Sequence, residues 1–404
     1  MNAWVPRMNC MNHRSHRKPL CDTSWRDCLT RRAGARVRVC AHLAAVVAKW
    51  AVVAAIALHM TVSLGAGVGA VQSAYAQNGA AGDAVPDTGD SAPTDFTEIT
   101  PELRSTVDRG LAWLAAAQAD DGSWGNQRYG PHVGITSLAC LAFMSDGHLP
   151  GRGAYGDNVE RGLNFVLNHV QETGLIAAET SHGPMYGHGF ATLFLGEVYG
   201  MTHDPRVRES LVKAVRLIVG CQHPQGGWRY NPTPEDADIS VTICQIMALR
   251  SARNAGISVP KTTIDRAVAY VRHCQLPDGG FAYQIGNAGS LFPRSAAGVA
   301  ALYYAGIYED RALNQGLEYL LRYTPGQGRQ SNHHYFYGQY YAVQAMYLAG
   351  GDYWKQWFPA ASQELIDRQQ ANGGWTSTYG DSYGTSMALI VLTVPNRFLP
   401  IFLK

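Results

Sequence analysis

The stretch KAVRLIVGCQHPQGGW, residues 213–228, recurs with substitutions as RAVAYVRHCQLPDGGF (266–281) and RGLAWLAAAQADDGSW (109–124). Each copy begins with a basic and a small residue, continues through an apolar segment to a glutamine, and ends after a glycine turn in an aromatic residue. A fourth copy ends in Gly373-Gly374-Trp375, with Gln370 as its glutamine. The glutamines lie about one or two lengths of ~50 residues apart, and weaker copies at 159–171 and 313–321 fill the two gaps. The body of the chain therefore contains six repeat units.

Each repeat unit predicts two helices. The first has apolar residues at helical spacing and is followed by a turn with Pro, Asp or Gly. The second is almost wholly apolar or small, over 135–143, 190–198, 239–249, 295–304, 340–348 and 385–392. A helix that is apolar on every side is buried on every side. We therefore expect an all-α (α/α)6 toroid, in which six buried inner helices are surrounded by six amphipathic outer helices.

The repeat resembles the QW repeat of the terpenoid cyclase and protein prenyltransferase superfamily, over about residues 105–395. More narrowly, the chain resembles exported bacterial proteins of the squalene-cyclase/prenyltransferase-repeat group. This resemblance implies an α-α toroid whose central cavity holds an isoprenoid-like apolar ligand. The repeat glutamines and tryptophans are expected to be structural, because glutamine can bond free backbone groups at a helix end and tryptophan buries a large area.

Composition and charge divide the chain further. Its 404 residues carry 33 Lys+Arg and 31 Asp+Glu, a net charge of +2, and 46% of them are hydrophobic. This apolar content supports a large core, and the small net charge argues against a nucleic-acid partner. However, ten basic residues and only two acidic ones fall within 1–49, so the rest of the chain is net acidic.

The N-terminal residues read as a targeting segment. The basic region is followed by an uncharged apolar stretch from Trp50 and by Ala74-Tyr75-Ala76, the pattern of a secretory signal peptide cleaved near Ala76. An uncleaved membrane anchor is the alternative, because the apolar run is nearly long enough to span a bilayer. We thus expect a leader over 1–76, a flexible linker over 77–100 and the toroid over 101–404, in a protein that is either exported to the periplasm or exterior or held at the membrane.

Cysteine and histidine spacing gives no metal site. The body keeps Cys140, Cys221, Cys244 and Cys274, too few for a disulfide scaffold, and they are read as small buried residues. The sequence has no CxxC or HExxH motif, so neither a metal nor a cofactor is expected. The zinc prenyltransferases of the superfamily are not matched either, because the body has no D-x-C and Phe336-Tyr337-Gly338 stands where the resemblance would place F-Y-H.

Candidate functional residues lie at the starts of the inner helices. Parallel inner helices bring their N-termini to one end of the cavity, where the helix dipoles favour anions. The polar and aromatic residues expected to line this mouth are Tyr186, His188, Arg294, His333, His334, Tyr335, Tyr337, Asp381 and Tyr383. The dipeptide Tyr-Gly occurs at this place in three units.

An acidic cluster is the sharpest candidate for chemistry. Asp236-Ala237-Asp238-Ile239-Ser240 is similar to the D-x-D-D-T/S motif of squalene-type cyclases, whose middle aspartate protonates an alkene. The resemblance implies Asp238 as the acid, Asp236 as its assistant and Ser240 as the hydroxyl. Ile239 departs from the motif, because it replaces the last aspartate. The alternative is that Asp238 only caps its helix.

Three functions follow from this sequence. The first is a terpenoid-cyclase-like isomerase or lyase acting on an apolar isoprenoid. The second is a binding or scaffold toroid that holds a lipid, a glycan or a partner protein without turnover. The third is an extracellular carbohydrate-active toroid, whose site would combine His333, His334, Tyr335, Tyr337, Asp381 and Tyr383. Fold alone cannot separate them, and the sequence does not indicate an oligomeric state.

Overall fold

A computed structural model describes residues 99–126, 129–178, 183–327 and 334–403, which form one compact unit. The expected leader (1–76) and nearly all of the expected linker lie outside the described residues. Among the described helices, none combines the length and apolar character needed to cross a membrane.

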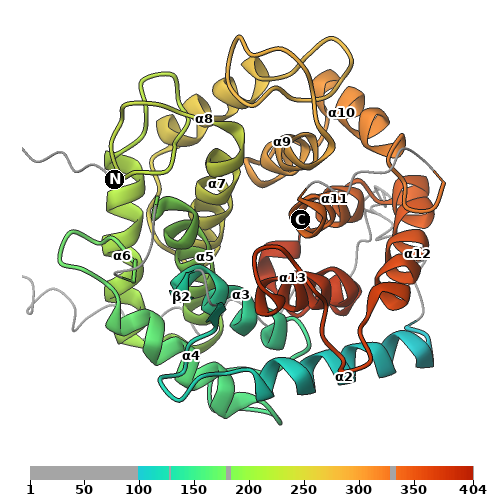
Figure 1. Ribbon diagram of the computed structural model, residues 1–404. Coiled ribbons are helices and arrows are strands. Elements are labelled where there is room, and N and C mark those ends of the chain that lie inside the picture. Colours follow the sequence, from blue (N-terminus) through green and yellow to red (C-terminus); the bar gives the residue numbers. More distant parts are fainter. Residues whose placement is uncertain (1–98, 127–128, 179–182, 328–333, 404) are drawn as a thin grey trace, which may run out of the picture. The chain divides into compact units, whose positions relative to one another are not determined.

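The described residues form twelve α-helices in two concentric rings (Figure 1). The outer helices are α2 (Pro101–Ala116), α4 (Gly156–Asn168), α6 (Pro205–Gly220), α8 (Lys261–His273), α10 (Arg311–Leu321) and α12 (Gly351–Arg368). The inner helices are α3 (Val133–Met144), α5 (Met185–Thr202), α7 (Ile239–Asn254), α9 (Phe292–Tyr304), α11 (Tyr335–Ala349) and α13 (Asp381–Thr393). Two short strands, β1 (Gly125–Asn126) and β2 (Gly130–Pro131), form a hairpin before α3.

The inner helices close into a complete ring. Each packs against the next in chain order, and α13 packs against α3. The outer helices α12 and α2 also meet, so the last unit lies beside the first. This arrangement confirms the (α/α)6 toroid, and ring closure explains why the array needs no capping repeats.

The apolar inner helices are buried as their sequence predicts. Every residue of α3 is buried, whereas α2 and the other outer helices bury one face only. The four described cysteines are buried and free, as expected for small core residues.

The repeat glutamines join each unit to the next. Gln222 Nε2 donates to the Gly226 carbonyl at 2.7 Å and to the carbonyl of Thr263, on the next outer helix, at 2.9 Å. Gln118 and Gln275 make the equivalent pairs of bonds. In the last unit this residue is Gln369 and not Gln370, because Gln369 bonds Gly373 and Thr106. The Gln369–Thr106 bond therefore closes the ring between units six and one.

The chain end covers the ring opposite the N-termini of the inner helices. After α13, the 3-10 turns η1 (Val394–Asn396) and η2 (Pro400–Phe402) fold back, and η2 packs on α7. Ile401 and Phe402 are each 2% exposed. The Ile401 amide donates to Glu197 Oε2 at 3.1 Å, and the Ser251 hydroxyl donates to Glu197 Oε1 at 2.6 Å.

Candidate functional site

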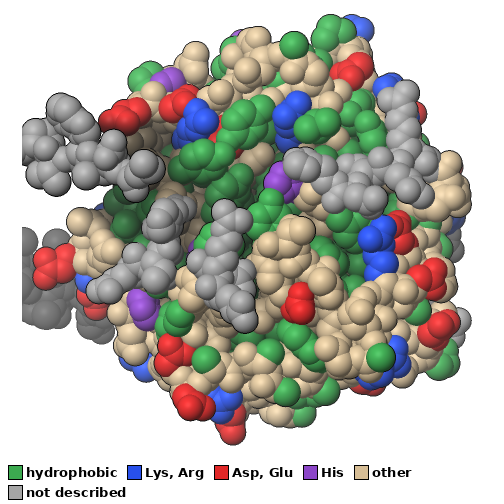
Figure 2. Space-filling view, in the orientation of Figure 1, with side chains coloured by type: hydrophobic (Ala, Val, Ile, Leu, Met, Phe, Trp, Pro, Cys, Tyr) green, Lys and Arg blue, Asp and Glu red, His purple; other side chains and the backbone are tan. Residues whose placement is uncertain are grey.

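A cavity of about 850 Å³ lies at the N-terminal end of the inner ring, and we call it the central cavity. All six inner helices or their caps contribute to its wall. The lining side chains on the helices are Ile135, Leu138, Tyr186, Phe190, Ser240, Pro293, Arg294, Tyr337 and Tyr383. Figure 2 shows hydrophobic side chains, tyrosine included, gathered over the middle of this face. The convergence of the six units therefore creates one largely apolar site.

Tyrosines dominate the wall, and the recurring Tyr-Gly dipeptides supply three of them. Tyr186, Tyr337 and Tyr383 all line the central cavity. The glycine beside each allows close packing: a Cβ on Gly338 would lie 2.6 Å from the ring of Phe292 on the neighbouring inner helix α9. The dipeptide therefore combines close helix packing with an aromatic side chain in the cavity wall.

Five further aromatic lining residues on loops or at a helix cap were not identified from the sequence: Tyr129, His132, Tyr230, Tyr283 and Tyr379. A signal for two of them exists. Tyr230 and Tyr283 each stand two residues after the repeat aromatic, in GGWRY and GGFAY. His132 caps α3 through Nδ1, which accepts from the Gly134 amide at 3.1 Å. Burial lowers the pKa of His132 to about 4, so its ring is neutral at physiological pH.

Asp238 is the N-cap of α7 and lies behind the cavity wall. Its side chain is fully buried, and Oδ1 accepts from the backbone amides of Ser240 and Val241, both at 2.9 Å. Oδ2 accepts from the Tyr283 hydroxyl at 3.2 Å, and Tyr283 in turn bonds the hydroxyl of Tyr230. Burial raises the pKa of Asp238 to about 6, against the hydrogen bonds that favour its ionised form. The carboxyl group is thus linked by hydrogen bonds to two tyrosines that line the central cavity.

The residues around Asp238 form a polar cluster. Asp236 is half-exposed and pairs with Arg229, and its Oδ1 accepts from Gln284 Nε2 at 2.9 Å. The guanidinium of Arg229 lies 5.2 Å from the ring centroid of Tyr230. Ser240 lines the cavity, and its backbone carbonyl accepts from the Tyr337 hydroxyl at 3.2 Å. Asp236 is therefore held by Arg229 and Gln284 and makes no described bond to Asp238.

The structure places His188 outside the central cavity. It is fully buried in α5, and its Nδ1 accepts from the Ile176 amide at 3.1 Å. Hydroxyls do the same in other units, where Thr136, Thr242, Ser295 and Thr385 accept from the amide of the repeat aromatic residue. Burial lowers the pKa of His188 to about 4. His188 thus has a structural role, because its side chain connects the turn at Ile176 to the inner helix α5.

The remaining sequence candidates divide between the wall and the rim. Arg294 lines the central cavity, but it donates through Nε to the Phe281 carbonyl at 3.0 Å and through Nη2 to the Gly289 carbonyl at 2.6 Å. Asp381 is exposed and accepts from the Ser377 amide at 3.2 Å. His333 lies outside the described residues.

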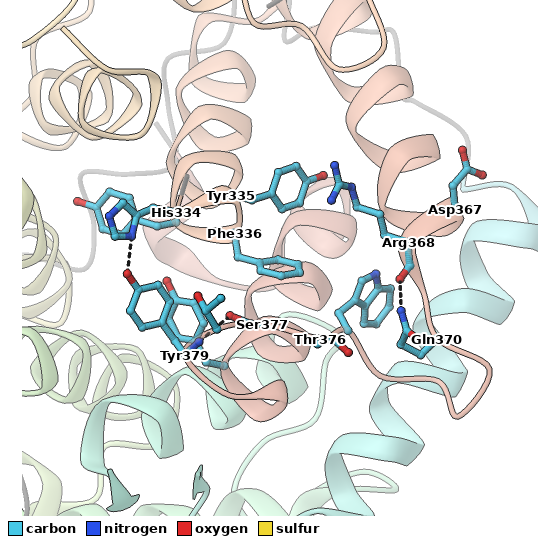
Figure 3. Close-up of a pocket in the computed structure, with 13 residues that line it drawn as sticks. His334, Tyr335, Phe336, Asp367, Arg368, Gln370, Thr376, Ser377 and Tyr379 are labelled. Carbon is cyan, nitrogen blue, oxygen red and sulfur yellow. Dashed lines mark hydrogen bonds between the residues drawn. The ribbon is translucent and has the colours of Figure 1, made fainter. Parts of the chain in front are cut away.

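A second, smaller pocket adjoins the first, and we call it the side pocket (Figure 3). It has a volume of about 350 Å³ and lies between the start of α11, the end of α12 and the loop before α13. The two pockets share the side chains of His334, Tyr337, Tyr379 and Tyr383. Tyr335 lines the side pocket, with the Arg368 guanidinium 4.1 Å from its ring centroid.

His334 and Tyr379 stand at the border of the two pockets. Their rings stack with centroids 5.6 Å apart, and the Tyr379 hydroxyl lies 2.6 Å from His334 Nδ1. Figure 3 shows this pair at one end of the side pocket and Arg368, Asp367 and Gln370 at the other. Across the described ranges, no group of three or more His, Cys, Asp or Glu residues is arranged to hold a metal ion.

Comparisons with known proteins agree with this architecture. The family model described as prenyltransferase alpha-alpha toroid domain matches residues 101–330. A curated relative, drimenyl diphosphate synthase of Streptomyces showdoensis, is 25% identical over 189 residues, which are 46% of this chain and 34% of the relative. The match thus spans about a third of that relative's length.

Solved structures show the same fold at low sequence identity. The type II terpene cyclase MstE from Scytonema, in complex with geranylgeranyl dihydroxybenzoate, is 15% identical with a TM-score of 0.52, covering 74% of this chain and 98% of that one. An inactive variant of an alpha-1,6-mannanase from Salegentibacter, in complex with alpha-1,6-mannotriose, is 8% identical with a TM-score of 0.56, covering 73% and 99%. At these identities the likeness concerns the fold alone.

Proposed function

This chain belongs to the prenyltransferase alpha-alpha toroid family, and we propose that its central cavity binds an isoprenoid-like apolar ligand. One observation carries the proposal: aromatic and aliphatic side chains from five of the six inner helices, together with Ser240 of α7, converge on a single cavity. Its volume of about 850 Å³ lies within the range of small-molecule sites. Among the described lining residues, Arg294 is the one Lys, Arg, Asp or Glu, and it bonds two backbone carbonyls.

The wall suits a branched, unsaturated chain better than a sugar. Leu138, Ile135 and Phe190 form apolar surface in the cavity wall, and burying an apolar chain against such surface is favourable in proportion to its area. Polar groups in the wall are mostly tyrosine hydroxyls, which fix orientation without opposing an apolar ligand. The names of the cyclase and synthase relatives also support an isoprenoid.

The binding test uses the full chain and geranylgeraniol, with affinity measured by titration calorimetry in detergent at fixed concentration. Leu138→Trp fills the wall of the cavity and is expected to weaken binding at least about tenfold. The control is Tyr308→Trp, because Tyr308 is 39% exposed and does not line the cavity. Equal affinity in all three proteins would contradict a site in the central cavity.

Acid-catalysed isomerisation or cyclisation is a second candidate, carried by Asp238. A buried carboxyl with a pKa near 6 keeps part of its population protonated near neutral pH. Its route to the cavity passes through the Tyr283 hydroxyl. Asp238 would give its proton to the Tyr283 oxygen while Tyr283 passes its own hydroxyl proton on, either directly to the ligand or to Tyr230, which in turn gives its hydroxyl proton to the ligand. Asp238 is left as the carboxylate. A non-catalytic binding toroid would share the cavity and lack this step.

The acid test compares Asp238→Asn and Tyr283→Phe. Asparagine also caps helices well, so Asp238→Asn is expected to keep the fold. If Asp238 is the acid, both variants retain geranylgeraniol binding but lose turnover of polyprenyl substrates, measured by gas chromatography of the products. Turnover that is unchanged in Asp238→Asn would remove Asp238 from the mechanism.

Export is a separate part of the proposal, supported by the basic and apolar pattern before Gln77. N-terminal sequencing of the protein from the expressing cell is expected to begin at or near Gln77. A start upstream of Trp50 would instead favour the membrane anchor.

A further inference from the structure

The side pocket and the central cavity are neighbouring spaces that share part of their walls. Four side chains belong to both walls, and His334 and Tyr379 stand between the two spaces. A single ligand that is longer than the central cavity would therefore enter the side pocket by passing these two side chains. The two parts differ in chemistry, and this difference indicates what such a ligand would carry.

The side pocket combines aromatic faces with neutral polar groups. Phe336 and Tyr383, which are both partly exposed, supply aromatic surface, while Thr376, Thr378 and Gln370 supply hydroxyl and amide groups. The central cavity instead has aliphatic residues such as Leu138 and Ile135 in its wall. Hydroxyl and amide groups can both donate and accept, so the side pocket suits a ligand group that does the same.

The charges of the side pocket balance and already have partners. Arg368 donates through Nε to Glu364 Oε1 at 2.9 Å and lies over the ring of Tyr335. Asp367 accepts from Gln363 Nε2 at 3.0 Å. Among the described residues that line the side pocket, one cation and one anion, each with a protein partner, leave no net positive charge to favour a phosphate or carboxylate.

The border residue His334 has an unusual backbone. Its φ of 50° lies in the left-handed region, which is costly for a residue with a side chain and persists where the surroundings impose it. In this conformation its ring stacks on Tyr379 and joins the Tyr379 hydroxyl through Nδ1. The strain thus accompanies the placement of a hydrogen-bonding pair at the junction of the two pockets.

We propose that the side pocket binds a neutral, polyhydroxylated head group, of the size of one sugar, on a ligand whose apolar chain lies in the central cavity. This inference rests on the proposed function, because the head is placed by its chain. His334 and Tyr379 would contact the bond region between head and chain, and Phe336 and Tyr383 would face the ring of the head.

The test compares three ligands on the full chain: geranylgeraniol, its β-glucoside and its monophosphate. The glucoside is expected to bind about tenfold or more tightly than the alcohol, since two net hydrogen bonds suffice for that gain. The monophosphate is expected to show no comparable gain. Affinities are measured at two salt concentrations, so that a non-specific attraction of the phosphate is recognised by its salt dependence.

Variants locate the head group. The double substitution Gln370→Leu with Thr378→Val removes an amide and a hydroxyl from the side pocket and is expected to reduce the glucoside to the affinity of the alcohol, which itself stays unchanged. The matched control is Gln225→Leu with Thr173→Val, because both residues are exposed in turns of other units and line neither pocket.

The outcomes separate this inference from the proposed function. If none of the three ligands binds, the proposed function fails. If the alcohol and the glucoside bind with equal affinity, the proposal that the central cavity binds the apolar chain is kept, and the proposal of a head-group site in the side pocket is overturned. A preference for the monophosphate that survives salt, or a glucoside gain that survives the side-pocket double variant, would also overturn it.

Discussion

The two ends of the inner helix ring are built differently. At the end where the helices stop, the chain's own C-terminal segment covers the ring, and Phe402 and Glu197 are buried. At the end where the helices start, the central cavity is open, and Phe190 in its wall packs against the buried ring of Tyr340. We call the end where the C-terminal turns pack the sealed end, and the end with the central cavity the open end. The sealed end should carry more stability, and the open end should carry binding.

The largest expected effect is at the sealed end. Phe402→Ala should lower the free energy of unfolding by about 3–5 kcal/mol, because a buried aromatic is replaced by a cavity. Leu291 lines the cavity at the open end and is 47% exposed. Leu291→Ala should therefore lower the free energy of unfolding by less than about 1 kcal/mol. Denaturant unfolding measures both. An equal loss in the free energy of unfolding for the two variants would contradict the expectation that the sealed end carries more stability.

The second largest effect is expected from Glu197, which should make the free energy of unfolding depend on pH. Burial raises its pKa to about 7 from 4.5, so the folded protein holds a proton that the unfolded chain releases earlier. The free energy of unfolding should therefore fall as pH rises from about 4.5 to 7, by on the order of 3 kcal/mol from this group. Glu197→Gln should remove that part of the slope, as measured by unfolding at several pH values. A slope that the substitution leaves intact would contradict this origin.

The open end should show a smaller effect of the same sign. Burial raises the pKa of Asp238 to about 6 from 3.8, so its contribution to the free energy of unfolding falls between about pH 4 and pH 6. Asp238→Asn should remove this change in the free energy of unfolding between about pH 4 and pH 6 while preserving the helix cap. Circular dichroism then checks that the variant keeps its helicity. Loss of helicity would mean that the carboxylate is needed for the fold itself.

The toroid itself was predictable because the same glutamine hydrogen bonds, from each repeat unit to its turn and to the next unit, recur along the chain. Gln118, Gln222 and Gln275 share one spacing to the turn glycine and make the same bonds. In the last unit two adjacent glutamines occur, and sequence alone selected Gln370 where Gln369 makes the joint. The spacing was the signal that should have decided between them, because Gln369 stands four residues before the turn glycine Gly373, as in the other three units, and Gln370 stands three before it.

The candidate site was predictable where it lies on regular structure. Tyr186, Tyr337 and Tyr383 stand at helix starts, and their convergence follows from a parallel inner ring. Tyr129 and Tyr379 were missed, because irregular loops bring them over the cavity and no periodicity reports their direction.

His188 was predicted to line the cavity, and this prediction was wrong. Its position at a helix start resembles that of the cavity tyrosines, yet it faces the preceding turn and replaces the hydroxyl used in other units. Two neighbouring positions at the same helix start can thus face the cavity or the core.

The central claim is that the open end binds an isoprenoid-like chain, and ligand-induced stabilisation tests it most directly. Geranylgeraniol at about 100 times its dissociation constant should raise the free energy of unfolding of the full chain by about 2.7 kcal/mol. The same concentration should stabilise Leu138→Trp much less, while Phe402→Ala, altered at the sealed end, should gain as much as the wild type. No stabilisation of the wild type, or an equal gain in Leu138→Trp, would contradict binding in the central cavity.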